Sequence, residues 1–143
     1  MKTPGGHLIS HADPLKARFG TCLRPSGAAG DGPADIYVDH LEWWVFYQDH
    51  VVGKGGSGYF IFDEPRGRAN FYPTEQDLFR QVQSLGLGAP TSRRLTSEDG
   101  WREAWAPLYR DACQRLKTGE VPAGVDQPTQ QRMKDLCGNL GFE

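Results

Sequence analysis

The stretch Leu41–Tyr72 reads LEWWVFYQDHVVGKGGSGYFIFDEPRGRANFY and holds nine of the sixteen aromatic residues of the chain. Apolar residues occupy both sets of alternating positions over Leu41–Val52 and again over Ser57–Asp63, whereas Arg68–Tyr72 is more polar. Runs of this kind, separated by glycine-rich or Pro-Gly turns, are typical of antiparallel strands. We therefore expect a sheet with strands in these three runs and its edge at the most polar one.

The two faces of the first run differ in composition. One set of alternating positions, with Trp43 and Val45, is almost uniformly apolar, which favours the protein core. The other set mixes Trp44 and Phe46 with acidic and amide side chains, a composition typical of the centre of a protein interface. It predicts a partner-binding surface made of Asp39, Glu42, Trp44, Phe46, Gln48 and Asp49. The alternative, that Trp44 and Phe46 lie in the core beneath the helices, stays open.

Three helices are expected after the strands. Thr74 and Gly86 carry the signals of an N-terminal and a C-terminal cap around a helix at Glu75–Leu85. A second helix is predicted over Glu98–Lys117, with a face that carries Trp101, Trp105, Leu108, Ala112 and Leu116, and with a kink or break at Pro107. A third is predicted over Thr129–Cys137.

The expected fold is an α+β domain, with an antiparallel meander of three or four strands packed on one face by two or three helices. A length of 143 residues fits a single domain over 1–143. The glycines and proline near the start predict a loosely ordered arm over 1–12, and the composition RPSGAAGDGPA predicts an exposed loop over 24–34.

Composition restricts the compartment and the class of partner. The three cysteines are odd in number and widely spaced, which favours reduced thiols and a cytoplasmic location. No apolar run is long enough for a signal peptide or a membrane span, so we expect no membrane partner. Residues 35–64 carry six acidic side chains and one basic one. Such an acidic segment repels nucleic acid and attracts basic protein surfaces.

The run Gly53–Gly58 matches the pattern G-x-G-x-x-G of dinucleotide-binding folds. That pattern needs a helix after the last glycine, and here a strand follows, so a flexible hairpin connection is the better interpretation. The alternative is a small enzyme or nucleotide-binding protein that uses this loop with His50 and Asp63. The histidines and cysteines show no catalytic or metal-ligand spacing, so we expect no cofactor, no metal and no catalysis.

Three segments carry a resemblance to known proteins. They are HVVGKGGSGYFIFDE at residues 50–64, NFYPTEQDLFRQVQSLGL at 70–87, and DGWREAWAP at 99–107. Together they resemble the small bacterial immunity proteins that neutralise polymorphic or secretion-system toxins. The resemblance implies a cytoplasmic, non-enzymatic inhibitor that occludes the active site of a cognate toxin. An acidic surface would suit a toxin whose active site is basic.

Overall fold

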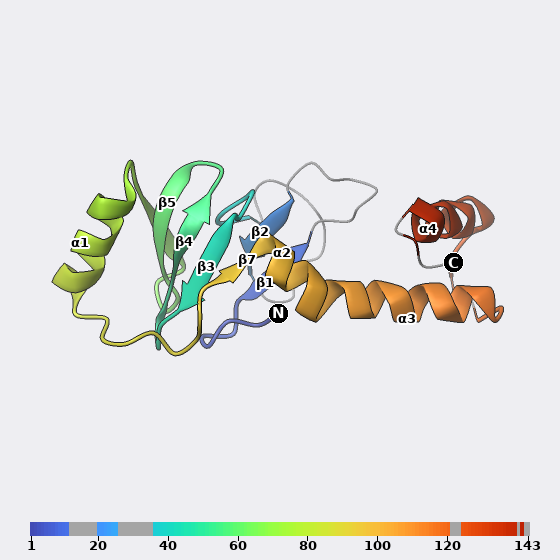
Figure 1. Ribbon diagram of the computed structural model, residues 1–143, viewed down its shortest axis with the longest axis horizontal. Coiled ribbons are helices and arrows are strands. Elements are labelled where there is room, and N and C mark those ends of the chain that lie inside the picture. Colours follow the sequence, from blue (N-terminus) through green and yellow to red (C-terminus); the bar gives the residue numbers. More distant parts are fainter. Residues whose placement is uncertain (12–19, 26–35, 121–123, 140, 142–143) are drawn as a thin grey trace.

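The computed structural model describes residues 1–11, 20–25, 36–120, 124–139 and 141, and has an α+β fold (Figure 1). A five-stranded antiparallel sheet has the order β6-β5-β4-β3-β7, and β1 and β2 form a separate antiparallel pair. The strands are β1 (Leu8–His11), β2 (Thr21–Arg24), β3 (Trp43–Phe46), β4 (His50–Gly55), β5 (Gly58–Asp63), β6 (Arg68–Tyr72) and β7 (Leu95–Thr96). The helices are α1 (Glu75–Leu85), α2 (Ser97–Gly100), the π-helix η3 (Trp101–Trp105), α3 (Ala106–Lys117) and α4 (Gln127–Asn139).

Strands β3 to β6 form the expected meander, and β7 adds a fifth strand beside β3. The expectation of one strand over Leu41–Val52 is wrong, because the chain turns back after Phe46, and the Tyr47 amide donates to the His50 carbonyl at 2.9 Å. Because of this turn, the residues after it point to the faces opposite to those expected for one continuous strand. Val51 consequently packs with Trp44, and Val52 packs on the opposite face.

Both faces of the sheet are covered by apolar side chains. Helix α1 lies along one face (Figure 1), where its buried residues join those of the sheet, namely Val45, Tyr47, Val52, Ile61, Leu78 and Val82. The other face packs on the β1–β2 pair, the segment before β3 and the π-helix, with buried residues Ile9, Leu23, Val38, Leu41, Trp44, Phe46, Val51, Phe60, Phe62, Leu95 and Trp105. The helices thus pack on two faces of the sheet, and not on one face as expected from the sequence.

The N-terminal residues are docked on the sheet, so the expectation of a loosely ordered arm over 1–12 is wrong for the described residues 1–11. Ile9 is fully buried on β1, which pairs with β2. Glu64 is also buried, and its Oε2 accepts a hydrogen bond of 2.6 Å from the Gly5 amide. Its Oε1 lies 3.4 Å from Nδ1 of His7. Most of the expected loop over 24–34 lies outside the described residues.

Helix α1 confirms its predicted bounds and caps. The Thr74 hydroxyl accepts from the Asp77 amide at 3.1 Å, and Gly86 ends the helix with φ 63°, in the left-handed region that glycine adopts without strain. Its buried residues Leu78 and Val82 point to the sheet.

The predicted break at Pro107 is also confirmed. The chain forms a wider π-helical turn just before Pro107, in which the Ala106 amide donates to the Trp101 carbonyl. A π-helical turn contains about one residue more than an α-helical turn, so the side chains that follow it point in other directions around the helix axis than an unbroken α-helix would give. Trp105 is buried as expected, whereas Leu108 is 67% exposed and leaves the predicted apolar face.

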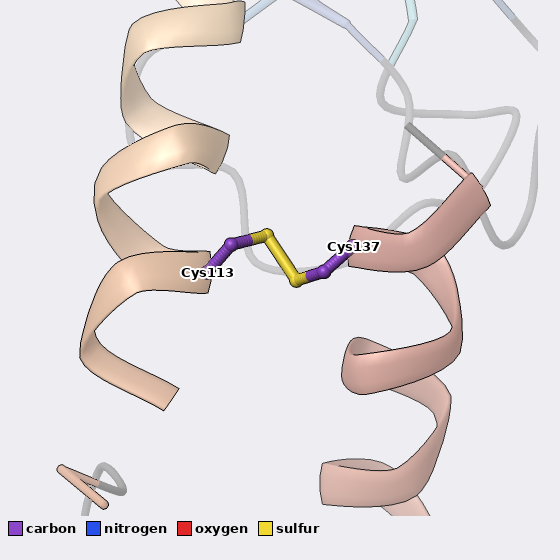
Figure 2. Close-up of a disulfide and its surroundings, with 2 residues drawn as sticks. All are labelled: Cys113 and Cys137. Carbon is purple, nitrogen blue, oxygen red and sulfur yellow. A yellow bond between two sulfur atoms is a disulfide. The ribbon is translucent and has the colours of Figure 1, made fainter. Parts of the chain in front are cut away.

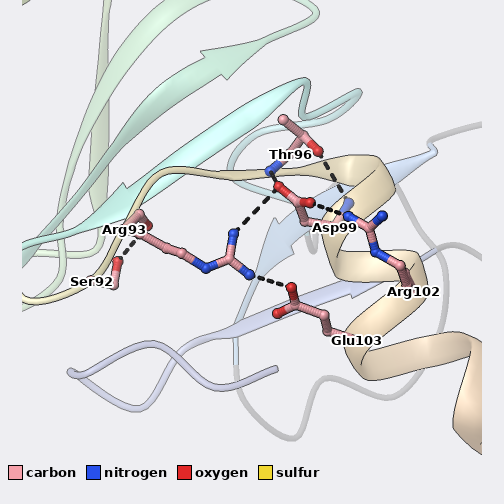
Figure 3. Close-up of polar contacts among 6 residues, drawn as sticks. All are labelled: Ser92, Arg93, Thr96, Asp99, Arg102 and Glu103. Carbon is pink, nitrogen blue, oxygen red and sulfur yellow. Dashed lines mark hydrogen bonds and ion pairs between the residues drawn. The ribbon is translucent and has the colours of Figure 1, made fainter.

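An ion-pair network fixes the start of α2 to the segment that precedes β7 (Figure 3). Asp99 forms a capping box with Thr96, in which the Thr96 amide donates to its Oδ2 at 3.0 Å. Its Oδ1 accepts from Arg102 at 2.6 Å, and Arg93 bridges Asp99 and Glu103. The Thr96 amide is the main reason that the pKa of Asp99 is lowered.

A disulfide joins Cys113 on α3 to Cys137 on α4 (Figure 2), with Cα atoms 5.8 Å apart. The expectation of three reduced thiols is therefore wrong, and among the described cysteines Cys22, buried on β2, is the one outside the disulfide. The pairing is not evident from the sequence, because the two cysteines are 24 residues apart and meet only when α3 and α4 fold back on each other. In the described ranges, no helix is long and apolar enough to cross a membrane.

Candidate functional site

A row of four side chains crosses the α1 face of the sheet beside the β4–β5 turn. In the strand register Trp43 lies opposite Lys54, Lys54 opposite Tyr59, and Tyr59 opposite Tyr72. Directly opposed residues point to the same face of a sheet. All four are half-buried. We call these four residues the Trp43 row.

Arg94 and helix α1 border the Trp43 row. The guanidinium carbon of Arg94 lies 3.8 Å from the centroid of the Trp43 ring, which is the geometry of a cation–π contact. Its Nη2 also lies 3.2 Å from Oε1 of Glu75 in α1. Phe79 of α1 lies almost parallel to the Trp43 ring, at 6° and 6.3 Å between centroids. Trp43 is therefore held in one orientation while part of its surface stays accessible.

The lysine of the row is neutralised locally. Nζ of Lys54 lies 3.1 Å from Oε2 of Glu42 and 5.3 Å from the centroid of the Tyr59 ring. The hydrogen bond with Glu42 raises the pKa of Lys54, so the amine stays charged at neutral pH. Burial raises the pKa of Tyr72, so its phenol stays neutral there. The row thus consists of three amphipathic rings and a lysine, and both Lys54 and the neighbouring Arg94 are paired with glutamates.

Trp44 and Phe46 are buried on the opposite face of the sheet, so their predicted exposure on a partner-binding surface is wrong. Trp44 is 0% exposed and Phe46 is 9% exposed. Among the residues that the structure describes, none accepts a hydrogen bond from the indole Nε1 of Trp44, and a buried donor without a partner costs about 1–3 kcal/mol. Burying a Trp side chain of roughly 150–250 Å² contributes about 4–6 kcal/mol, so hydrophobic burial outweighs the unpaired donor.

The other four predicted contact residues lie at two ends of the sheet. Asp39 and Glu42 are near the β4–β5 turn, where the Gly56 amide donates to the Asp39 carbonyl at 2.9 Å. Gln48 and Asp49 are exposed in the turn between β3 and β4 at the other end. The predicted surface is therefore divided, and Glu42 is the member that contacts the Trp43 row.

The alternative enzyme or nucleotide site is not assembled. His50 and Asp63 are brought together as a cross-strand pair, with Nε2 and Oδ2 3.8 Å apart. They form the first pair of the β4–β5 hairpin, whereas Gly55 and Gly58 form its last. Five steps of about 3.3 Å along the strand separate these pairs by roughly 16 Å. The histidine and the glycine loop thus lie at opposite ends of the hairpin.

Close packing explains the glycines of the hairpin. A Cβ on Gly53 would lie 2.2 Å from the Trp43 carbonyl oxygen, and one on Gly55 would lie 2.4 Å from Cγ1 of Val38. Contacts this short require the backbone or the core to move. The hairpin connection is confirmed, and its glycines allow neighbouring backbone and core side chains to approach.

Sequence reasoning assigned Trp43 to the core and missed Lys54, Tyr59, Tyr72 and Arg94. A two-residue turn at residues 56–57 sets the register of β4 and β5, so the pair Lys54–Tyr59 could have been counted from the sequence. The contact of Arg94 with Trp43 could not have been counted in this way, because Arg94 lies in the segment between α1 and β7, which has no regular apolar pattern.

The comparisons with protein-family models, curated proteins and solved structures find no match to this chain. Within the described ranges, no group of three or more His, Cys, Asp or Glu side chains could hold a metal ion.

Proposed function

We propose that this protein is a binding protein of the immunity type, which inhibits a cognate bacterial toxin by occluding its active site. The observation that carries the proposal is the Trp43 row with Arg94 stacked on it. Trp, Tyr and Arg are the residue types that supply most binding energy at protein interfaces. The row and Arg94 together present all three residue types, and the row lies on the face of a sheet, which lowers the entropy lost on binding.

The charges at the site favour a protein partner over nucleic acid. Lys54 is paired with Glu42, and Arg94 is paired with Glu75. Binding to nucleic acid draws its affinity from cations that neutralise phosphates. Because acidic side chains already satisfy both cations of the site, little positive charge is left for a phosphate backbone.

Acidic side chains near the row suit a basic partner surface. Glu42 contacts Lys54 of the row, and Asp39 lies beside the same hairpin turn. Exposed carboxylates at the border of an aromatic patch accelerate association with a basic surface and improve its specificity. They support, together with the resemblance to immunity proteins, a toxin with a basic active site as the partner.

Co-purification from the native host tests the proposal. A tagged copy of the chain is expected to capture one protein in a stoichiometric complex. That protein should arrest growth when expressed alone, and co-expression of this chain should restore growth. Capture of a partner whose activity is unaffected in the complex, or growth arrest that persists on co-expression, would reject inhibition as the function.

The contact surface is tested with Trp43→Ala in the same complex. Loss of an interface hot spot of at least about 2 kcal/mol weakens affinity roughly 30-fold. Leu108→Ala is the matched control, because Leu108 is an exposed apolar residue on α3. It should leave affinity within about twofold. Equal affinity for both variants, with both folded, would place the interface elsewhere.

A further inference from the structure

Among the elements that the structure describes, α3 is the one on which α4 mainly packs. Figure 1 shows α3 extending away from the sheet and α4 beside its distal part. Cys137 is the one buried residue of α4 in the described part of the chain. It forms a small cluster with Cys113 and Leu116 of α3 and the half-buried Met133.

The described polar contacts of α4 are local. The Thr129 amide donates to Asp126, Gln130 donates to the Val125 carbonyl, and Gln131 donates to Asp135. These contacts stabilise the helix itself and do not attach it to α3. The disulfide is therefore the main attachment between the two helices.

Without that attachment, few contacts within the described part of the chain keep α4 folded. It has 13 residues, and isolated helices of up to about 12–15 residues are marginal in water. The two sheet-face clusters contain no residue of α4 and none of α3 beyond Tyr109. Loss of α4 would thus leave the sheet core and the Trp43 row intact.

We propose that the Cys113–Cys137 disulfide is a redox-controlled clasp, whose reduction by a dithiol releases α4 while the sheet stays folded. One thiolate of the dithiol attacks one sulfur of the disulfide and forms a mixed disulfide, and the other cysteine leaves as a thiolate. The second thiol of the dithiol then displaces the first cysteine. Two electrons and two protons pass to Cys113 and Cys137, and the dithiol becomes a cyclic disulfide.

Both cysteines are less than a tenth exposed, at 6% for Cys113 and 9% for Cys137. An attacking thiolate therefore reaches the sulfurs when the α3–α4 contact opens. Opening is easiest at the least stable part of a fold, and α4 has the fewest buried residues of the longer helices. The small number of buried residues in α4 therefore makes the helix depend on the disulfide, and it also allows the sulfur atoms to become exposed.

Hydrogen exchange of the full chain, measured by mass spectrometry with and without dithiothreitol, tests the clasp. On reduction, the α4 amides should exchange at least about tenfold faster, and the amides of β3, β4 and β5 should be unchanged. The variant Cys113→Ser/Cys137→Ser should show fast α4 exchange under both conditions. Cys22→Ser is the matched control, and should keep the response of the wild type.

Two results would overturn the proposal. One is equal protection of α4 in the oxidised and reduced protein, which would mean that packing alone holds the helix. The other is three free thiols after treatment with oxidised glutathione, which would mean that the disulfide does not form in solution. This test needs no partner, so its outcome is independent of the proposed toxin inhibition.

Discussion

The sheet domain and the α3–α4 hairpin are held together in different ways. The sheet buries large side chains on both faces, with Trp44, Phe60 and Phe62 fully inaccessible. The hairpin buries Cys113, Leu116 and Cys137 and carries a covalent cross-link. Burial at about 25 cal/mol per Å² stabilises the first, whereas restriction of the unfolded chain stabilises the second. A region too small to bury a core can still be ordered by one bond.

The largest effect is expected from Trp44→Ala, at about 3–5 kcal/mol of unfolding free energy, because a fully buried Trp leaves a cavity. Trp43 is the adjacent residue and is half-buried, so Trp43→Ala should lower the unfolding free energy by only about 1–2 kcal/mol. Urea unfolding followed by circular dichroism gives both values. Equal losses for the two variants would contradict the assignment of Trp44 to the core and Trp43 to the surface.

Removal of the disulfide should have the next largest effect, and only on the hairpin. Closing a loop of 24 residues stabilises by about 3–4 kcal/mol in the loop-entropy estimate. In Cys113→Ser/Cys137→Ser this stability should be lost from α4, while the urea midpoint of the sheet moves little. A large fall in the midpoint reported by near-ultraviolet signals of the sheet aromatics would show that the two regions unfold together.

A glycine substitution in the sheet should have a smaller effect. Gly55→Ala places a Cβ against Val38 and the Asp39 carbonyl, and overpacking of this kind costs about 1–3 kcal/mol. Ser57→Ala in the exposed turn of the same hairpin is the control, and should stay within about 0.5 kcal/mol of the wild type. Equal stability of the two variants would mean that the turn is loose and does not pack against residues 38–40.

The smallest effect is expected at the junction of the two regions. The pKa of Asp99 is lowered from 3.8, chiefly by the Thr96 amide. A carboxyl with a lowered folded pKa stabilises the fold above its unfolded pKa, and this contribution is lost as pH falls through the folded value. Between about pH 5 and about pH 2, the melting temperature of Asp99→Asn should therefore fall less than that of the wild type.

Asp126→Asn is the matched variant in the hairpin, because the pKa of Asp126 is also lowered, by its hydrogen bonds with Thr129. Its acid response should appear in the hydrogen exchange of α4 and leave the sheet unaffected. If both variants changed the melting temperature of the sheet at acid pH by the same amount, Asp126 would stabilise the sheet as much as Asp99 does, which would contradict the account.

Local sequence signals predicted the parts of the fold that depend on neighbours in the chain. The bounds and caps of α1 follow from Thr74 and Gly86, and the break at Pro107 follows from its missing amide. The turn at residues 47–49 was not predicted, because apolar residues continue on both sides of Gln48 and Asp49. The prediction placed these two polar residues on opposite faces of one long strand.

The parts that depend on distant residues were not predicted. Cys113 and Cys137 meet only once two helices fold back on each other. Arg94 reaches Trp43 from beyond α1, and Trp44 is buried because the N-terminal segment and the π-helix cover its face. The sequence identified an aromatic sheet with acidic neighbours, but the covering elements decide which of two adjacent tryptophans faces the solvent.

Tyr72 and Phe71 offer the most direct test of the binding surface. These neighbours on β6 point to opposite faces, Tyr72 into the Trp43 row and Phe71 towards Phe60. Calorimetric titration of the captured partner should show affinity weakened at least about tenfold by Tyr72→Ala and within about twofold of the wild type for Phe71→Ala. The reverse order, or no loss for Tyr72→Ala in a folded protein, would contradict the assignment of the Trp43 row as the partner-binding surface.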